Sequence, residues 1–143
     1  MDQTTYIANH IDPEGDYLYR LYRATNLHTL HGRMASGHLQ GRLLKMFVQM
    51  TQAKRVLEVG TFSGYSAICL AEGLPDDGLL YTFEINDEQE DFTRPWIEGS
   101  AVANYLGTVI MRIPSKSAGG TIQIVGGERS IASVTLDPSS NPG

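Results

Sequence analysis

The chain has 143 residues, a length that favours one compact domain. It carries 11 Lys and Arg against 16 Asp and Glu, a formal charge of −5, so it lacks the basic excess that binding to nucleic-acid phosphates requires. No apolar run approaches the roughly 20 residues of a membrane span, and the N-terminus lacks the pattern of a secretory signal. The single cysteine, Cys69, excludes an internal disulfide and fits a reducing compartment. We therefore expect a cytoplasmic protein that binds neither nucleic acid nor a membrane.

The first third of the chain is predicted to be helical. Apolar residues recur at helical spacing over residues 16–29 and again over residues 36–52. The second of these segments carries a single apolar stripe, formed by Leu39, Leu43, Met46, Phe47 and Met50. Such a stripe has to be buried against another surface.

Strands and helices then alternate. Residues 55–59 read as a short buried strand, 65–72 as a helix, 79–85 as a strand, 87–99 as a helix and 106–113 as a third strand. This order predicts an α/β fold in which parallel strands are joined by right-handed crossovers. Ligands of such sheets bind beyond the carboxyl ends of the strands.

Two places at that edge carry candidate binding groups. Gly60 ends the first strand and lets a ligand approach the backbone, while Gly64 permits a tight entry into the next helix. Ser66 adds a hydroxyl at the start of that helix, where an anionic group is favoured. Glu84 closes the second strand, where a carboxylate can accept both hydroxyls of a ribose. Together these groups suit a ligand with a carboxylate, a ribose and an adenine.

The glycine spacing separates two cofactors. Dinucleotide sites use G-x-G-x-x-G, whereas this chain has Glu58-x-Gly60-x-x-x-Gly64 without a third glycine in register. Phe62 and Tyr65 are also bulky for a turn that holds a pyrophosphate. S-adenosylmethionine (SAM) has no pyrophosphate and needs fewer glycines, so the pattern favours SAM over a nicotinamide dinucleotide. A plain strand–turn–helix without a ligand is the simpler alternative.

Three segments carry a resemblance to a known family. They are Val56–Ala67 (VLEVGTFSGYSA), Thr82–Asn86 (TFEIN) and Arg33–Gly41 (RMASGHLQG). They resemble the first motif, the second motif and the segment before the long helix of the cation-dependent O-methyltransferases, which include catechol and caffeoyl-CoA O-methyltransferases and bacterial relatives. The likeness runs from about Tyr6 to about Ile110. It implies a Rossmann-like SAM-dependent methyltransferase fold, truncated to its cofactor-binding half, with a parallel sheet and N-terminal helices.

The resemblance implies cofactor-binding roles for Ser36, Glu58, Gly60, Thr61, Phe62, Ser66 and Glu84. Glu58 would hold the amino group of SAM, Ser66 its carboxylate and Glu84 its ribose. Ser36 would lie beside the methionine portion and Phe62 near the sulfonium. The backbone of the remaining two residues would face the cofactor.

Simpler explanations stay open for three of these residues. Glu58 could pair with Lys54 or Arg55, which precede it closely. Ser36 could only cap the helix that follows it. Ser66 could only satisfy the first turn of its own helix.

The resemblance also implies a divalent cation such as Mg²⁺, which in this family binds neighbouring oxygens of the acceptor and lowers its hydroxyl pKa. The family's ligands, two aspartates and an asparagine, are not found in the expected context. Asp137 lies near the place of the first aspartate, but Pro138 follows it, as is typical of a turn. His28, His31 and His38 lack a fourth ligand for zinc. We therefore assign no metal ligand and no catalytic residue.

The pattern changes after about Ile110, where Gly, Pro and Ser become frequent. We divide the chain into a methyltransferase cofactor-binding domain, residues 1–110, and an atypical tail, residues 111–143, that is foreign, for example frame-shifted, or poorly ordered. Within the tail, residues 121–125 and 130–136 could pair as a hairpin.

These observations predict a SAM-dependent O-methyltransferase that transfers a methyl group to a hydroxyl of a small, catechol-like acceptor. The missing metal and substrate half would impair it. The alternative is a non-catalytic, truncated methyltransferase-like domain that binds cofactor or a partner. A nicotinamide-dependent oxidoreductase is the weaker third choice. A homodimer stays open, because relatives commonly pair.

Overall fold

The computed structural model describes residues 2–110, 121–124 and 134–135. Its helices are α1 (Gln3–Ala8), α2 (Asp16–His28), α3 (Gly37–Thr51), α4 (Tyr65–Ala71) and α5 (Glu90–Glu98). Short 3-10 turns cover Gly32–Met34, Asp87–Gln89 and Ala103–Tyr105. The strands are β1 (Arg55–Val59), β2 (Leu79–Glu84), β3 (Leu106–Ile110), β4 (Thr121–Ile124) and β5 (Val134–Thr135). The predicted alternation of helices and strands is confirmed.

The first three strands form the predicted parallel sheet in the order β1-β2-β3. In its register Glu58 lies opposite Thr82, and Val59 lies opposite Phe83. β4 pairs antiparallel with β3, and β5 pairs antiparallel with β4, as expected for a hairpin of these two segments. The carboxyl ends of β1 and β2 therefore meet at one edge of the sheet.

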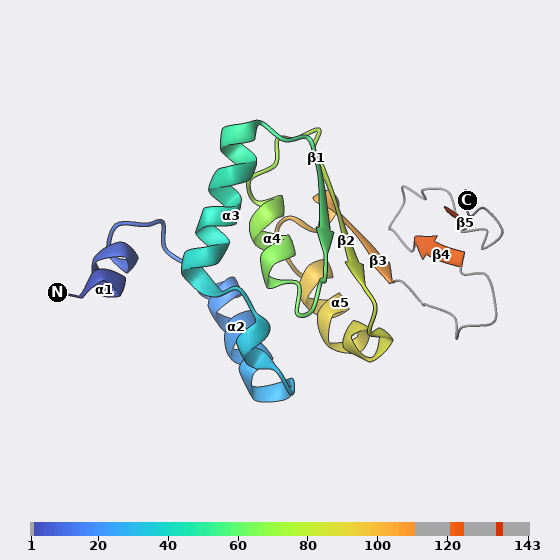
Figure 1. The fold of residues 1–143 in the computed structure, drawn as a ribbon, viewed down its shortest axis with the longest axis horizontal. Helices are drawn as coiled ribbons and strands as arrows, with labels where there is room; N and C mark the ends of the chain where they lie inside the picture. Colours follow the sequence, from blue (N-terminus) through green and yellow to red (C-terminus); the bar gives the residue numbers. More distant parts are fainter. Residues whose placement is uncertain (1, 111–120, 125–133, 136–143) are drawn as a thin grey trace, which may run out of the picture.

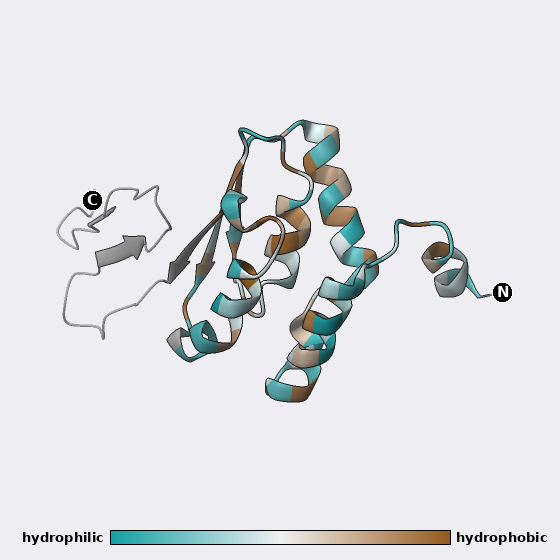
Figure 2. Ribbon diagram, turned by 180° about the vertical axis from the view of Figure 1, so that it is seen from behind, coloured by the Kyte–Doolittle hydropathy of each residue, from teal (hydrophilic) through white to brown (hydrophobic). Residues whose placement is uncertain are grey.

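Helices α2 to α5 lie on one face of the sheet, and α1 extends away from them (Figure 1). Figure 2 shows hydrophobic residues concentrated on α4, which lies between the sheet and α3. The buried core cluster joins α2 to α4 and consists of Leu18, Leu21, Tyr65, Ile68 and Cys69. Trp96 of α5 packs against this cluster, and its carbonyl accepts a hydrogen bond from the Tyr17 hydroxyl at 2.5 Å. One helical layer thus covers one side of the sheet.

The expected burial of the apolar stripe on α3 is wrong for the described residues. All five stripe side chains are 42–71% exposed, while Gly41 and Val48 are the buried residues of this helix. The reason is close packing on α4: a Cβ atom on Gly41 would lie 2.6 Å from Cys69 Sγ. The helix therefore turns its glycine, and not its stripe, toward α4.

β1 is also more exposed than the sequence predicts. Its side chains alternate, and Leu57 and Val59 are 64% and 79% exposed. Among the described strands β1 pairs with β2 alone, so it stands at the edge of the sheet. The apolar run of residues 55–59 predicts a fully buried strand, but the described helices cover only one of its faces.

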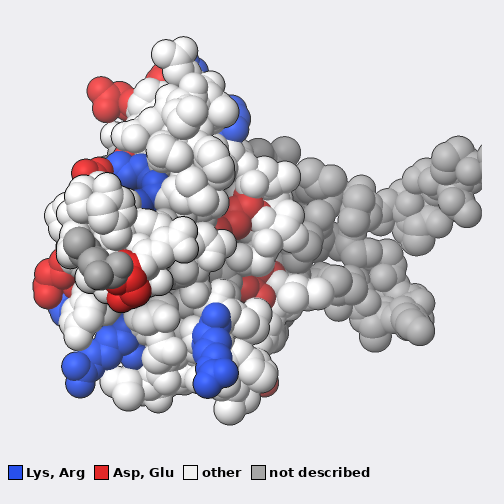
Figure 3. Space-filling model, turned by 60° about the vertical axis from the view of Figure 1, so that its left-hand side comes forward, with Lys and Arg blue, Asp and Glu red and all other residues white. Residues whose placement is uncertain are grey.

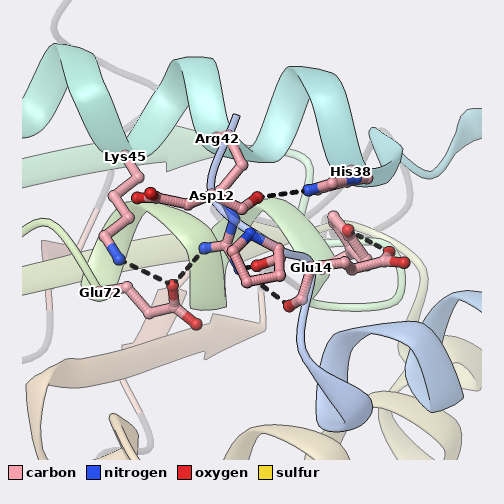
Figure 4. Close-up of polar contacts among 8 residues, drawn as sticks. Asp12, Glu14, His38, Arg42, Lys45 and Glu72 are labelled. Atoms are coloured by element: carbon pink, nitrogen blue, oxygen red, sulfur yellow. Dashed lines mark hydrogen bonds and ion pairs between the residues drawn. The ribbon is translucent and has the colours of Figure 1, made fainter. Parts of the chain in front are cut away.

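Arg42 ties the segment before α2 to α3 and α4 (Figure 4). Its guanidinium donates to Glu72 Oε2 at 2.7 Å and to the carbonyl oxygens of Pro13 and Glu14 at 2.6 and 2.8 Å. The Arg42 and Glu72 side chains are only 11% and 26% exposed, so water weakens this ion pair little. Lys45 Nζ lies 3.4 Å from the same carboxylate oxygen.

Two further hydrogen bonds fix the same segment. The Tyr65 hydroxyl donates to Glu14 Oε1 at 2.6 Å, and His38 Nε2 donates to the Asp12 carbonyl at 2.7 Å. These bonds therefore hold residues 12–14, which we call the strap, against the start of α3 and of α4. Because Tyr65 opens α4, the strap also fixes where that helix begins.

We expect Arg42→Ala to lower the free energy of unfolding by about 2–3 kcal/mol, because two carbonyls lose their donor and the largely buried Glu72 carboxylate keeps, of its described cationic partners, only Lys45, at 3.4 Å. Urea unfolding followed by circular dichroism measures this loss. Arg42→Lys should recover less than half of this loss, because a single ammonium group cannot replace the several N–H donors of a planar guanidinium. Arg23→Ala, on the exposed side of α2, is the control. A loss for Arg42→Ala no larger than that of the control would show that the strap does not stabilise the fold.

Charges on the surface are mixed in sign. Figure 3 shows basic side chains separated from one another by acidic and uncharged ones on the face it presents. Exposed ion pairs join Arg20 to Asp16 at 2.9 Å and Lys54 to Asp77 at 2.6 Å. Among the described residues no helix has the length and apolar character needed to cross a bilayer.

Candidate functional site

A cavity of about 430 Å³ opens at the carboxyl end of β1. It lies between β1, the loop after it, the start of α4 and the residues that precede α3. Six of the seven residues predicted to bind cofactor line it, namely Ser36, Glu58, Gly60, Thr61, Phe62 and Ser66. The seventh, Glu84, binds the backbone of the same loop. The structure therefore brings all seven residues to one place.

The loop after β1 has a special backbone. Gly60 and Gly64 have φ values of +96° and +82°, and Phe62 adopts a φ of +48°, which is rare for a side chain of its kind. Gly64 is also crowded, because a Cβ there would meet Ile97 Cγ1 at 3.0 Å. No atom lies within 4 Å of a Cβ built on Gly60, so only its conformation requires glycine.

Hydrogen bonds hold this loop to β2 and α5. The N–H groups of Gly60 and Thr61 both donate to the Phe83 carbonyl, at 2.8 and 3.0 Å. The hydroxyl of Thr93, on α5, donates to the Phe62 carbonyl. These bonds explain how a phenylalanine is kept in a left-handed conformation.

Glu84 holds the loop from the end of β2. Its Oε2 accepts the Phe62 N–H at 2.7 Å, and its Oε1 accepts the N–H groups of Ile85 and Asn86 at 2.9 Å each. A carboxylate offers about four lone-pair positions, so three backbone donors leave room for one more. The sequence-based expectation that Glu84 accepts both ribose hydroxyls would therefore require one backbone donor to leave.

Glu58 accepts two hydroxyl donors inside the cavity wall. Ser66 Oγ donates to Oε1, and Thr82 Oγ1 donates to Oε2 at 2.5 Å. Burial raises the pKa of the Glu58 carboxyl above its usual value, the two hydroxyls act in the opposite direction, and the nearby charge of Glu84 adds to the increase. The two hydroxyl donors thus favour the ionised form of Glu58 against the effect of burial.

The simpler explanations for Glu58 and Ser36 do not hold. Lys54 pairs with Asp77, and Arg55 donates to the carbonyls of Lys54 and Asp77 at 2.8 and 2.9 Å. Ser36 occupies the N-cap position of α3, but its side chain makes no capping hydrogen bond. Both residues instead face the cavity.

Ser66 is already engaged in the structure. Its hydroxyl has one proton, which it donates to Glu58. Donation to a cofactor carboxylate would require that proton to leave Glu58. In the observed arrangement the Ser66 hydroxyl is therefore bonded to Glu58.

Sequence reasoning missed Thr82 and Thr93, both buried polar residues. The register gives a signal for the first, because Thr82 lies on β2 directly opposite Glu58. Alternation along β2 also places Thr82 on the same side as the fully buried Leu80. Thr93 lies 31 residues after Phe62, and no local pattern connects them.

No group of three or more His, Cys, Asp or Glu side chains that could hold a metal ion occurs in the described part of the chain. Asp137, the one aspartate considered as a cation ligand, lies outside the described residues. The residues in view therefore do not supply the ligand set that a divalent cation needs.

Curated proteins are similar to part of this chain. The chain is 34% identical over 91 residues to tricin synthase 2 of Oryza sativa subsp. japonica and 37% identical over 67 residues to caffeoyl-CoA O-methyltransferase 2 of Petunia hybrida. These matches cover 64% and 47% of the chain and 31% and 28% of the two relatives. The chain thus spans less than a third of the length of these curated relatives.

Solved structures agree. The O-methyltransferase of Bacillus cereus in complex with SAH matches with 27% identity and a TM-score of 0.66, over 74% of this chain and 48% of the other. The O-methyltransferase TomG of Streptomyces achromogenes in complex with SAM matches with 27% identity and a TM-score of 0.68, over 83% and 59%. The family model described as O-methyltransferase matches residues 8–112. The chain therefore belongs to the O-methyltransferase family, as its motifs predict.

Proposed function

We propose that this chain is the cofactor-binding part of a SAM-dependent O-methyltransferase whose acceptor is a small molecule with a catechol-like hydroxyl. One observation carries the proposal: Glu84 and the loop after β1, which lie on neighbouring parallel strands, are joined at the cavity through the 2.7 Å bond to Phe62. Relatives solved with SAH and with SAM have the same fold, and curated relatives are named for caffeoyl-CoA and tricin.

The residues divide the work of binding. Glu84 offers its remaining acceptor position to a ribose hydroxyl, and Glu58 offers an ionised carboxylate to the amino group of SAM. Phe62 lines the same cavity, and we assign it to the sulfonium end of the cofactor. When bound, SAM supplies a methyl group that an acceptor oxygen displaces in line. Holding the donor in one orientation is this chain's part of the rate enhancement.

The proposal includes the domain division, the oligomeric state and the location expected from the sequence. We assign residues 1–110 to the cofactor-binding domain and residues 111–143 to an atypical tail, although β4 of that tail pairs with β3 of the sheet. The exposed stripe of α3 supports a homodimer, and the lone, buried Cys69 supports a cytoplasmic location. Because the described residues supply no cation ligands, no step of acceptor activation is assigned to this chain.

Titration calorimetry with S-adenosylhomocysteine (SAH) and with NAD tests the cofactor. We expect one molecule of SAH to bind per chain and NAD to give no heat. Binding of NAD without binding of SAH would overturn the proposal in favour of a nicotinamide enzyme.

Transfer of a labelled methyl group to a catechol with added Mg²⁺ separates the two remaining functions. Turnover supports an enzyme. Binding of SAH without turnover at saturating cofactor would assign this chain to the alternative, a non-catalytic cofactor-binding domain.

A further inference from the structure

Thr82 is hydrogen-bonded to two residues of the cofactor site, Thr61 and Glu58. It lies on β2, and its side chain is fully buried. Its hydroxyl is 2.6 Å from the Thr61 hydroxyl and 2.5 Å from Glu58 Oε2. An ionised carboxylate only accepts hydrogen bonds, so Thr82 donates its single proton to Glu58 and accepts the proton of Thr61. The direction of both hydrogen bonds is therefore fixed: Thr61 donates to Thr82, and Thr82 donates to Glu58.

We propose that Thr82 is a positioning residue of the cofactor site. Its buried hydroxyl joins the Thr61 side chain to the Glu58 carboxylate and holds both side chains in place next to the loop that follows β1. Thr82 does not line the cavity itself, so it acts through these two residues. The inference rests on the proposed function, because it gives Glu58 the task of holding the amino group of SAM.

The charged and polar groups around Glu58 explain why the hydrogen bond from Thr82 is important. Glu84 on β2 is the charged group that acts on Glu58, and its negative charge opposes ionisation. Ser66 and Tyr65 from α4 and Gln40 from α3, which line the same cavity, carry no positive charge. Hydroxyl donors therefore take the place of a cation in stabilising the buried carboxylate, and Thr82 is one of two.

Removing the hydroxyl at constant shape should shift ionisation. In Thr82→Val the Glu58 carboxylate keeps only Ser66 as a donor, so the pKa of Glu58 rises further. Glu58 then loses its charge at a higher pH, and the amino group of SAH loses its partner there. Thr82→Ser keeps the donor and is the matched control.

The experiment measures the SAH dissociation constant by calorimetry from pH 5.5 to 8.5 for the wild type and both variants. We expect affinity to fall toward acid in all three, with the midpoint of Thr82→Val about one pH unit higher, so that its affinity is about tenfold weaker on the acid side of both midpoints. Thr82→Ser should stay within about threefold of the wild type. Coinciding profiles for Thr82→Val and the wild type would overturn the proposal.

A second readout needs no ligand. Folding raises the pKa of Glu58, so its ionised form costs stability above that pKa, and the cost disappears as the pH falls below it. The stability deficit of Thr82→Val in urea should therefore be largest at pH values above the pKa of Glu58 and shrink as the pH falls below it. A deficit that does not change with pH would show a purely structural role.

These readouts separate the two proposals. If the wild type does not bind SAH, the proposed function fails, and the stability profile still tests the bond from Thr82 to Glu58. Thr82→Ala is the second variant, for the case that valine is not accommodated. If neither Val nor Ala folds while Ser does, the hydroxyl serves the fold and the positioning role is overturned.

Discussion

Glu84→Ala is expected to weaken SAH binding by about 10- to 100-fold, the effect of removing hydrogen bonds to a charged group. The variant removes the acceptor that we propose for the ribose. It also frees the N–H of Phe62, which Glu84 holds at 2.7 Å, so the loop loses its tie to the end of β2. Calorimetry with SAH at constant pH and salt measures the change.

The controls for this prediction use neighbouring carboxylates. Glu88→Gln changes an exposed acid four residues further on and should leave SAH affinity within about twofold. Glu84→Gln keeps one acceptor oxygen but places an amide NH₂ among backbone donors, so it should fall between the wild type and Ala. Wild-type affinity in Glu84→Ala would remove the ribose role from this residue.

Gly41→Leu should destabilise the fold by about 3 kcal/mol, at the upper end of the cost of overpacking a core. Even a single Cβ at Gly41 would lie 2.6 Å from Cys69 Sγ and 3.0 Å from Tyr65 Cε1, so α3 would have to move away from α4. Urea unfolding followed by circular dichroism measures the loss of stability.

Two comparisons test the packing explanation. Gln49→Leu places the same side chain on an exposed position of α3 and should change stability by less than about 0.5 kcal/mol. Gly41→Ala should be milder than Leu, and adding Cys69→Ala should recover part of its loss by removing the closest atom. Equal stability of Gly41→Leu and the wild type would mean that α3 and α4 are not packed this closely.

The elements and the position of the site were predictable because local signals specify them. The alternation of strand and helix patterns predicts the parallel sheet, and a parallel sheet brings the end of β1 to the end of β2. Gly60 and Glu84 are placed at that edge by chain order alone. The resemblance to O-methyltransferases supplied the residue roles, which geometry by itself leaves open.

What escaped prediction depends on contacts between distant segments. The face that α3 buries is decided by the close approach of Gly41 to Cys69, which no helical periodicity encodes. The left-handed Phe62 depends on Thr93, and the hydroxyl chain below Glu58 depends on strand register. The partial exposure of β1 follows from the number of its neighbours, which a strand's own composition does not report.

The position of β1 at the rim of the sheet has one more consequence. Its outer side presents backbone N–H and C=O groups next to the exposed Leu57 and Val59, and such an edge accepts an added strand readily. Glu58 belongs to the same strand, and the glycine loop follows directly. A polypeptide that pairs along this rim would therefore lie beside the cavity that residues of β1 line.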